Sequence, residues 1–366
     1  MLDRTEPPFE YETWLDSAPE ALLDNGAESA APDVTRDEKR SPLVRESHND
    51  TPTLLLAAAI YGAFFAVTWF YHEIALWLIL PIGAIIVCLQ SSLQHEAVHG
   101  YPTRWPWLNH LIAAPTLSLW EPFGIIRDDH LRHHIDENLT DPHHDPESNY
   151  LAPETSAGLS LLHRRTREAM TILPTRMVIG PIYLATMSLL RLVQAVRTGD
   201  AIVLRHWTLH AVALAALTWW IVGVCGIPLL EYVLFFAWPG AALTLIRSFA
   251  EHQWAPDVPA RTATVEAGPI MSFLFLNNNL HSLHHAEPAL PWYERPRQYR
   301  ARRNELLGES RYHLIDGYGA LFRRYTFEAK EPLLHPALVR RRSVEVSRRS
   351  EADACQSGEE PLRTAA

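Results

Sequence analysis

Long apolar blocks alternate along this chain with polar stretches that are rich in charge. Residues 53–71 contain no charged side chain, and residues 74–93 form a second apolar block after only His72 and Glu73. Each block is long enough to cross a bilayer as an α-helix, and the short polar break predicts a transmembrane hairpin. The alternative is a soluble bundle of unusually apolar helices, but two such blocks rarely follow each other in a soluble fold.

A second pair of apolar blocks has the same plan. It covers residues 207–227 and 229–246, which are joined at Pro228. This pair predicts a second hairpin, and therefore four membrane spans in total.

Two further apolar segments carry charges that argue against a crossing. Residues 172–193 include Arg176 and Arg191, and residues 107–126 include Glu121. If 172–193 crossed, the arginine-rich stretches on its two sides would face opposite sides of the membrane. An interfacial or re-entrant position keeps them on one face, as the positive-inside rule favours. We therefore predict an all-α integral membrane protein with four transmembrane helices as two hairpins, interfacial helices and both termini in the cytoplasm.

The two ends of the chain differ from its middle in composition. The formal net charge is -10, and much of it comes from acidic residues among Pro, Ala and Ser in residues 1–50. Such a segment has no apolar periodicity and is expected to be a disordered acidic tail. Residues 336–366 are also poor in apolar side chains and are expected to be disordered, which leaves residues 51–335 as the membrane domain.

Histidines cluster in three short boxes on the predicted cytoplasmic side. The boxes read HEAVH at 95–99, HLRHH at 130–134 and HSLHH at 281–285. On a helix, positions i, i+3 and i+4 share one face, so each box forms a row of imidazoles. Their number exceeds what one tetrahedral zinc ion uses and suits two metals, although imidazole binds iron, zinc, copper and nickel alike.

Other polar residues near the boxes are candidates for supporting roles. Three aspartates are expected to hold histidine N–H groups: Asp136, Asp141 and Asp145. His143 and His144 lie among prolines and are expected to support the site or to lie at the surface. Glu251 and His252 follow the fourth predicted span, and His252 is a candidate ninth nitrogen ligand. Either Asn278 or Asn279 is a candidate to hold a metal-bound water.

With two hairpins around them, the three boxes resemble the membrane fatty acid desaturase and hydroxylase superfamily of non-haem di-iron, oxygen-dependent enzymes. The resemblance covers roughly residues 50–330. The strings LRHHIDENLTDPHHDPES, RSFAEH and NNNLHSLHHAEPALPWY are similar to a bacterial branch labelled fatty acid desaturase. The resemblance implies a cytoplasmic di-iron cap and iron ligation by His95, His99, His130, His133, His134, His281, His284 and His285, with His252 as an extra ligand. Glu96 inside the first box has no role that the resemblance assigns.

The reaction that the resemblance implies is desaturation, the removal of two hydrogens from adjacent carbons of a fatty acyl or lipid-like chain. Zinc does not change oxidation state, so iron with molecular oxygen as co-substrate is the expected pair. The chain has no G-x-G-x-x-G, haem motif or cysteine cluster to carry electrons. We therefore expect a separate donor, either a ferredoxin or a small cytochrome with its reductase. The arginines between Arg295 and Arg303 form a candidate basic face, either for an acidic donor or for lipid headgroups.

Several alternatives remain open at this stage. The same boxes serve hydroxylases of the superfamily and desaturases of small polar metabolites, such as the enzyme that forms the vinyl ether of rhizobitoxine. A less favoured alternative is an intramembrane zinc protease with His95 and His99 as ligands, Glu96 as base and Asp316 as a further ligand. A metal transporter should place charged ligands within its spans, which are nearly free of them. The expected partners are membrane lipid, the electron donor and a lipid or small-molecule substrate, with no nucleic acid, and the expected location is a bacterial inner membrane.

Overall fold

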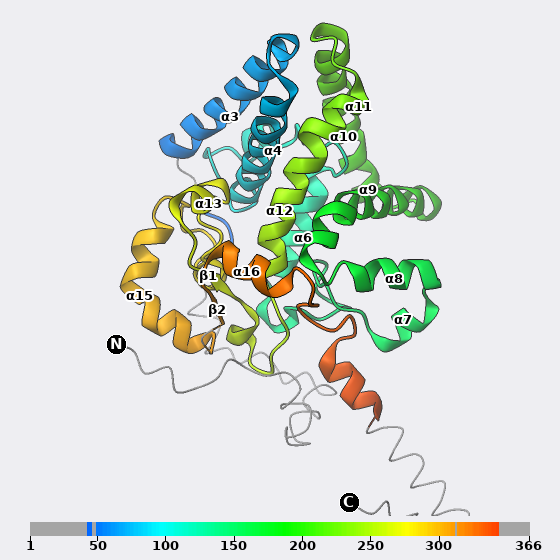
Figure 1. The fold of residues 1–366 in the computed structure, drawn as a ribbon, viewed down its shortest axis with the longest axis vertical. Coiled ribbons are helices and arrows are strands. Elements are labelled where there is room, and N and C mark those ends of the chain that lie inside the picture. The colour runs from blue at the N-terminus through cyan, green and yellow to red at the C-terminus, as the bar shows by residue number, and fades with distance from the viewer. Residues whose placement is uncertain (1–41, 46–48, 312, 344–366) are drawn as a thin grey trace, which may run out of the picture.

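The computed structural model describes residues 42–45, 49–311 and 313–343, which are mostly helical. Long helices gather at one end of the molecule, and short helices, loops and a small sheet form a compact cap at the other end (Figure 1). Most of the tails predicted to be disordered lies outside the described residues. Their described parts have defined structure, since residues 336–343 are helical and residues 42–45 contact the cap.

The first predicted hairpin consists of α3 (Thr51–Trp69) and α4 (Leu76–Val98), which pack against each other. Helix α3 begins after Asp50, whose carboxylate accepts a hydrogen bond from the backbone N–H of Thr53 at 2.9 Å. Helix α4 continues past its predicted end at residue 93, so that His95 lies in its last turn. The same helix therefore supplies apolar surface at one end and histidine ligands at the other.

The second predicted hairpin is longer than its two apolar blocks. It consists of α10 (Ala201–Thr218) continued by a π-helical segment (Trp219–Val224), and of α11 (Leu229–Tyr232), a second π-helical segment (Val233–Ala237) and α12 (Trp238–Glu251). The last three elements run on without a break, which brings the end of α12 into the cap.

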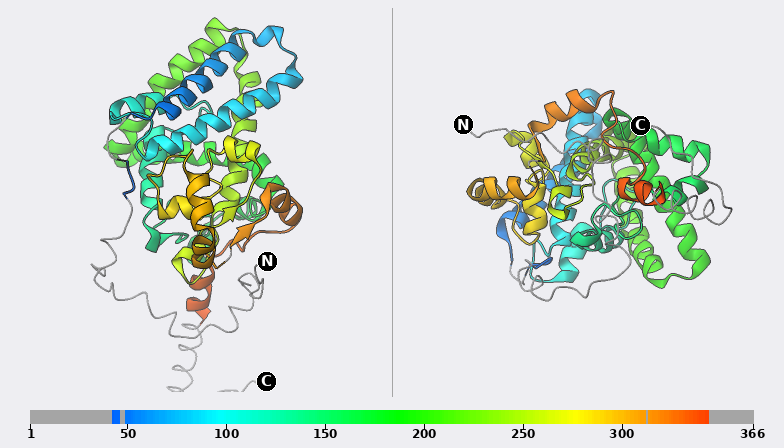
Figure 2. Two further views of the ribbon diagram at one scale, coloured as in Figure 1. Left: turned by 90° about the vertical axis from the view of Figure 1, so that its left-hand side faces the viewer. Right: turned by 90° about the horizontal axis from the view of Figure 1, so that it is seen from below.

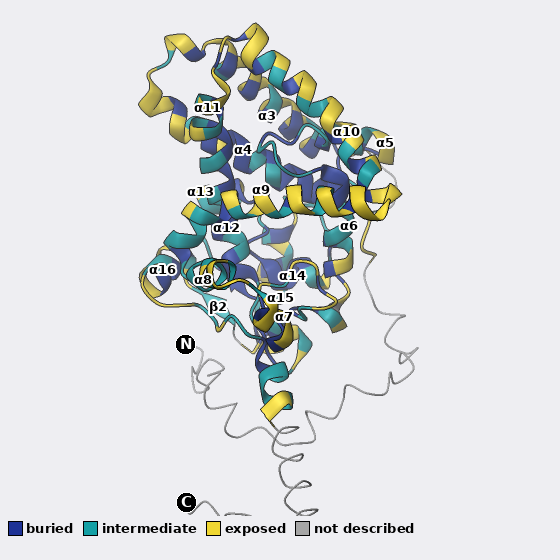
Figure 3. Cartoon of the chain, turned by 90° about the vertical axis from the view of Figure 1, so that its right-hand side faces the viewer, coloured by how far each residue is buried: buried dark blue, intermediate teal, exposed yellow. Residues whose placement is uncertain are grey.

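Among the described residues, five helices are long and apolar enough to cross a membrane, and α9 (Leu173–Thr198) is one of them. These five helices fit an integral membrane protein. Figure 3 shows α9 lying crosswise to α10, with much of its length exposed. Arg191 on α9 forms an ion pair of 2.5 Å with Asp129. The crosswise direction is typical of a helix that lies along a membrane surface, and the number of crossings stays a prediction.

The other segment that we predicted not to cross is broken into two helices. Helix α5 (Pro106–Ala113) ends well before α6 (Phe123–His133) begins. In the part of the chain that the structure describes, no helix of membrane-spanning length covers residues 107–126.

Short elements build the cap, which lies beyond the ends of α4 and α12 (Figure 2). Its helices are α7 (Pro153–Gly158), α8 (Leu161–Ala169), α13 (Pro269–Leu274), α14 (His281–Ala286), α15 (Arg295–Glu309) and α16 (Gly317–Tyr325). The cap also contains 3-10 turns at Asp136–Asn138 and Val258–Arg261, whereas the turn at Tyr71–Glu73 joins α3 to α4. Strand β1 (Thr264–Val265) pairs in parallel with β2 (Leu314–Ile315), which ties the segment before α14 to the segment after α15.

Helix α4 is the centre of the packing, because α3, α12 and the second π-helical segment all contact it. Two glycines allow the closest approaches. A Cβ atom on Gly240 of α12 would lie 2.4 Å from Cβ of Val87, and one on Gly83 of α4 would lie 2.6 Å from the carbonyl oxygen of Phe235. These distances are too short for any side chain, as is common where membrane helices pack closely.

We expect Gly240→Ala to destabilise the protein by about 1–3 kcal/mol, because the added methyl group overpacks the contact between α4 and α12. Thermal or denaturant unfolding of the detergent-solubilised protein measures this change. Gly62→Ala in α3 is the matched control, since a Cβ atom added there meets no neighbouring atom within 4 Å. Equal unfolding midpoints for the two variants would contradict the packing role of Gly240.

Candidate metal centre

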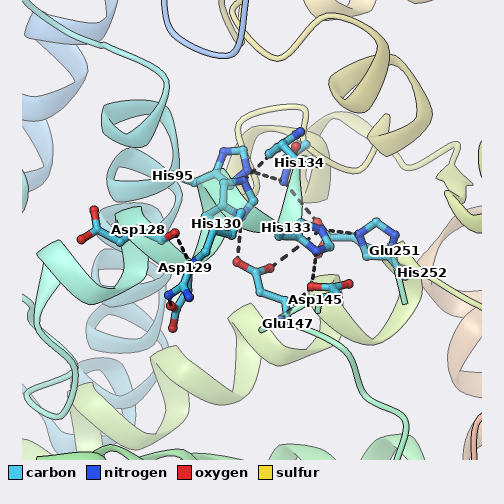
Figure 4. A network of polar contacts seen from close by, with 12 residues as sticks. His95, Asp128, Asp129, His130, His133, His134, Asp145, Glu147, Glu251 and His252 are labelled. Carbon is cyan, nitrogen blue, oxygen red and sulfur yellow. Dashed lines mark hydrogen bonds and ion pairs between the residues drawn. The ribbon is translucent and has the colours of Figure 1, made fainter. Parts of the chain in front are cut away.

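Histidines from four helix ends meet where the long helices enter the cap (Figure 4). They are His95 and His99 at the end of α4, His130, His133 and His134 at the end of α6, His252 at the end of α12, and His281, His284 and His285 in α14. All three boxes are helical or end a helix, so the i, i+3 and i+4 spacing does place their rings on shared faces. The structure brings every predicted site histidine into one region.

Eight of these histidines form two groups in which the nearest ring nitrogens all lie within 4.8 Å of one another. Cluster A contains His95, His99, His130 and His284, and cluster B contains His133, His252, His281 and His285. Helices α6 and α14 contribute to both clusters, whereas α4 contributes only to A and α12 only to B. The spacing of the two clusters is therefore set by how α6 and α14 pack.

His134 lies at the boundary of the two clusters. Its Nε2 is 3.1 Å from Nε2 of His130 and 3.0 Å from Nε2 of His284, both members of cluster A. Its ring also stacks on that of His285 in cluster B, with 4.3 Å between the centroids. His134 thus adds its Nε2 to the four histidines of cluster A.

Four of the histidines are oriented by an acceptor at Nδ1. The acceptors are the Leu43 carbonyl for His99 (2.7 Å), Glu147 for His130 (2.9 Å), Asp145 for His133 (2.9 Å) and the Arg261 carbonyl for His252 (3.2 Å). A hydrogen on Nδ1 leaves the lone pair on Nε2, which is the tautomer that binds a metal. Each of these acceptors therefore fixes both the ring orientation and the nitrogen that faces the cluster.

The Nε2 atoms converge in a way that fits metal ions. In cluster B, Nε2 of His252 lies 2.9 Å from Nε2 of His133 and 2.8 Å from Nε2 of His281. One lone pair on His252 cannot accept hydrogen bonds from both neighbours, whereas a shared cation would satisfy all three nitrogens. Two ligands at about 2.1 Å from one ion, at right angles, are about 3 Å apart, which matches this spacing. In cluster A, Nε2 of His99 is buried and has no hydrogen-bond partner among the described residues.

The pKa values of the histidines follow from burial and from the neighbouring carboxylates. Burial lowers the pKa well below its usual value in His99, His134, His252, His281 and His284. These rings are neutral, as metal ligands must be. His133 differs: burial alone would lower its pKa, but Glu147 and Asp145 raise it to about 9. The two carboxylates thus stabilise positive charge at this ring, which a metal ion on Nε2 would supply in place of a proton.

Glu147 joins the two clusters and escaped the sequence-based prediction. Its Oε1 is 2.9 Å from Nδ1 of His130 in cluster A, and its Oε2 is 4.0 Å from Nε2 of His133 in cluster B. Although the side chain is 40% exposed, the charges of these two histidines hold the pKa of Glu147 well below its usual range. The only signal in the sequence is its place two residues after Asp145, in the same acidic string.

Not all predicted supporting residues reach the centre. Asp145 does, but Asp141 instead contacts His144 (3.1 Å), and His143 contacts Glu154 (3.1 Å), all at the exposed face of the loop. The prediction for Asp141 was therefore wrong, because the loop turns it away from the boxes. The side chain of Asp136 lies outside the described residues.

Asn278 is the asparagine that lies at the centre. Its Nδ2 is 3.3 Å from Nε2 of His95 and 3.1 Å from Oε1 of Glu251, whose carboxylate is also 3.3 Å from Nδ1 of His281. Asn279 donates to the carbonyl of Val265 at 2.8 Å and so supports β1 instead. Only Asn278 therefore lies beside the histidines, and the metal-bound water stays a prediction.

Glu96 is held by a buried arginine. Its Oε1 lies 2.7 Å from Nη2 of Arg295, and both side chains are fully buried. The same oxygen is 3.5 Å from Nδ1 of His95. A protease base needs to face a metal-bound water, whereas this carboxylate is paired. Asp316 is exposed and belongs to neither cluster. Both features argue against the protease alternative.

The basic face expected between Arg295 and Arg303 is much reduced. Arg295 is buried against Glu96, Arg302 pairs with Glu287 and Glu305, and Arg303 pairs with Glu266. Arg297 and Arg300 are the exposed arginines of this helix. A run of arginines in the sequence does not reveal which of them have acidic partners, and docking of a donor or of lipid headgroups at the remaining arginines stays a prediction.

Comparison with known proteins agrees with this geometry. A family model described as fatty acid desaturase matches residues 74–317, which contain all nine histidines of the centre. No curated protein matches the chain.

We expect Arg295→Met to cost about 3–5 kcal/mol of stability, because it leaves the buried carboxylate of Glu96 without its partner. Unfolding of the purified protein measures the loss, and Arg297→Met on the exposed side of α15 is the control. The double variant Glu96→Gln with Arg295→Met should recover much of the loss. If Arg295→Met were as stable as the control, the buried pair would not hold this end of α4 in place.

Proposed function

Because the chain belongs to the fatty acid desaturase family, we propose that it is an oxygen-dependent di-iron desaturase that introduces a double bond into an aliphatic fatty acyl or lipid-like chain. In this reaction two hydrogens leave adjacent carbons. Molecular oxygen takes them up together with two protons and two electrons from a donor, and two molecules of water form.

The observation that carries the proposal is the arrangement of clusters A and B. Each offers at least four convergent imidazole nitrogens, and together they exceed the needs of a tetrahedral zinc site. We propose His95, His99, His130, His134 and His284 as ligands of one iron, and His133, His252, His281 and His285 as ligands of the other. Two bound irons supply, with oxygen, the oxidising power that an unactivated C–H bond requires.

The side chains around the clusters have distinct tasks in this proposal. Asp145 and Glu147 hold the Nδ1 hydrogens of His133 and His130, so that both Nε2 atoms face the metals. Glu147 also lies 4.0 Å from Nε2 of His133 in cluster B, so its negative charge would partly neutralise the cations of both clusters. Asn278 is placed to hold a water between His95 and Glu251. Seven of the nine histidines are buried, which limits the access of bulk water to the clusters, whereas His252 and His285 are half-buried.

The proposed topology has four crossings, formed by α3, α4, α10 with its π-helical extension, and α11 with α12. Helix α9 then lies in the membrane interface, which its crosswise direction and the ion pair between Arg191 and Asp129 support. An even number of crossings leaves both termini and the cap on one side. We place that side in the cytoplasm of a bacterial cell, because the arginine-bearing stretches gather there.

The remaining parts of the proposal concern the partners. A separate protein, a ferredoxin or a small cytochrome with its reductase, delivers the electrons. The substrate is a lipid chain that enters from the bilayer, in keeping with the membrane helices around the centre.

We expect the purified protein to bind about two iron ions per chain and little zinc, as measured by elemental analysis. Asp145→Asn should weaken iron retention by about 10- to 100-fold, because His133 loses the partner that orients it. Asp141→Asn is the matched control, since Asp141 contacts only the exposed end of the same loop. One zinc per chain without iron would contradict the proposal.

Expression in a host followed by lipid and metabolite profiling, with and without oxygen, tests the reaction itself. We expect an oxygen-dependent lipid product that lacks two hydrogens, and we expect His133→Ala and His284→Ala to abolish it. His144→Ala, on the exposed loop, should leave it unchanged. A gain of one oxygen would indicate a hydroxylase, and a changed polar metabolite would indicate the small-molecule alternative.

A further inference from the structure

The segment before the first membrane helix reaches the metal centre. The carbonyl oxygen of Leu43 accepts a hydrogen bond from Nδ1 of His99 at 2.7 Å. The backbone N–H of Arg45 donates to the carbonyl of the same histidine at 2.9 Å. This N-terminal strap, residues 42–45 with Asn49 and Asp50, therefore holds both the side chain and the main chain of His99.

The strap is fixed at its other end by Asp50. The Asp50 carboxylate forms an ion pair of 2.7 Å with Arg45, and the Asp50 backbone N–H donates to the carbonyl of Pro102 at 2.8 Å. The guanidinium of Arg45 also lies over the ring of Tyr101, 4.8 Å from its centroid. These contacts close the strap around the residues that follow the first histidine box.

Asp50 further connects the strap to the third box. It accepts a hydrogen bond from the hydroxyl of Tyr293 at 2.8 Å, while its other oxygen caps α3 through Thr53. Tyr293 lies between α14, which carries three of the histidines, and α15. A single carboxylate therefore joins the strap, the start of the first membrane helix and the segment after the third box.

Gly100 makes room for the strap. Its φ of 93° is unfavourable for residues with a side chain, and a Cβ atom there would lie 3.0 Å from Cγ1 of Val44 and 3.3 Å from the backbone of Arg45. The residue directly after His99 thus meets two requirements that glycine satisfies. Any side chain at this position pushes on the part of the strap that holds His99.

The consequence for His99 concerns its tautomer. A hydrogen bond to the Leu43 carbonyl keeps the hydrogen on Nδ1, so the lone pair is on Nε2, which faces cluster A. Without the strap the hydrogen is free to move to Nε2, where it blocks binding. We infer that the N-terminal strap is a positioning element for the iron at cluster A, acting through the Leu43 carbonyl on His99. This inference rests on the proposed function, since it takes cluster A to be an iron site.

Two full-length variants test the strap without altering any proposed ligand. Arg45→Ala removes the ion pair with Asp50, and Gly100→Ala displaces Val44. Arg104→Ala is the matched control, because it removes a nearby exposed arginine whose side chain lies over Trp105. Arg45→Lys, which keeps the charge opposite Asp50, should restore much of what Arg45→Ala loses.

The measurement is the release of iron to a ferrous chelator, with Mössbauer spectra of protein loaded with iron-57. In both variants we expect one of the two irons to leave about 10- to 100-fold faster and the spectrum of one iron to change. The unfolding midpoint of the metal-free protein is expected to fall in both variants, because Arg45→Ala leaves the buried Asp50 carboxylate without its ion pair and Gly100→Ala strains the backbone. The faster loss of one iron relative to the other is therefore the readout of positioning.

Two results would overturn the inference. One is iron release equal to that of the wild type in both variants. The other is equal acceleration for both irons, which would make the strap a general structural support. A wild-type protein that binds no iron would instead contradict the proposed function, which separates the two failures.

Discussion

The convergence of nine imidazole rings in a buried space is the constraint on which this structure depends. Each ring is polar, and most are neutral because burial disfavours their charged form. Unpaired ring nitrogens at this density are costly unless cations fill the space between them. The helices that carry the histidines therefore have to end at one place. Each outward-facing Nδ1 also needs a hydrogen-bond acceptor. Asp145, Glu147 and two backbone carbonyls meet that need in four of the rings.

The sequence was sufficient for the parts of the structure that follow a period. Apolar runs located the long helices, and the i, i+3 and i+4 spacing identified the eight histidines of the three boxes. His252 was identified by its place directly after the fourth apolar block. Boundaries were less accurate, because α4 and α12 extend as helices beyond their apolar blocks to residues 98 and 251. Polar residues near a helix end carry no signal that separates a continuing helix from a loop.

Contacts made by the main chain could not be predicted in this way. The carbonyls of Leu43 and Arg261 orient two histidines, but a backbone acceptor leaves no trace in the residue type. The pairing of Glu96 with Arg295 was equally hidden, because about 200 positions separate the two residues along the chain and only folding brings them together. Such long-range polar pairs decide whether a charged residue is a docking contact, a catalytic base or an internal support.

The close contact between α4 and α12 has a consequence for the membrane in which the protein lies. Bilayers differ in thickness, and helices respond by changing their tilt. His95 lies in the last turn of α4 and His252 directly follows α12, so an independent tilt of either helix would move one cluster's ligand away from the histidines of α6 and α14. Because Gly240 lets the backbone of α12 rest directly on Val87, we expect the two helices to tilt together. The geometry of the two histidine clusters would then depend little on the thickness of the surrounding lipid.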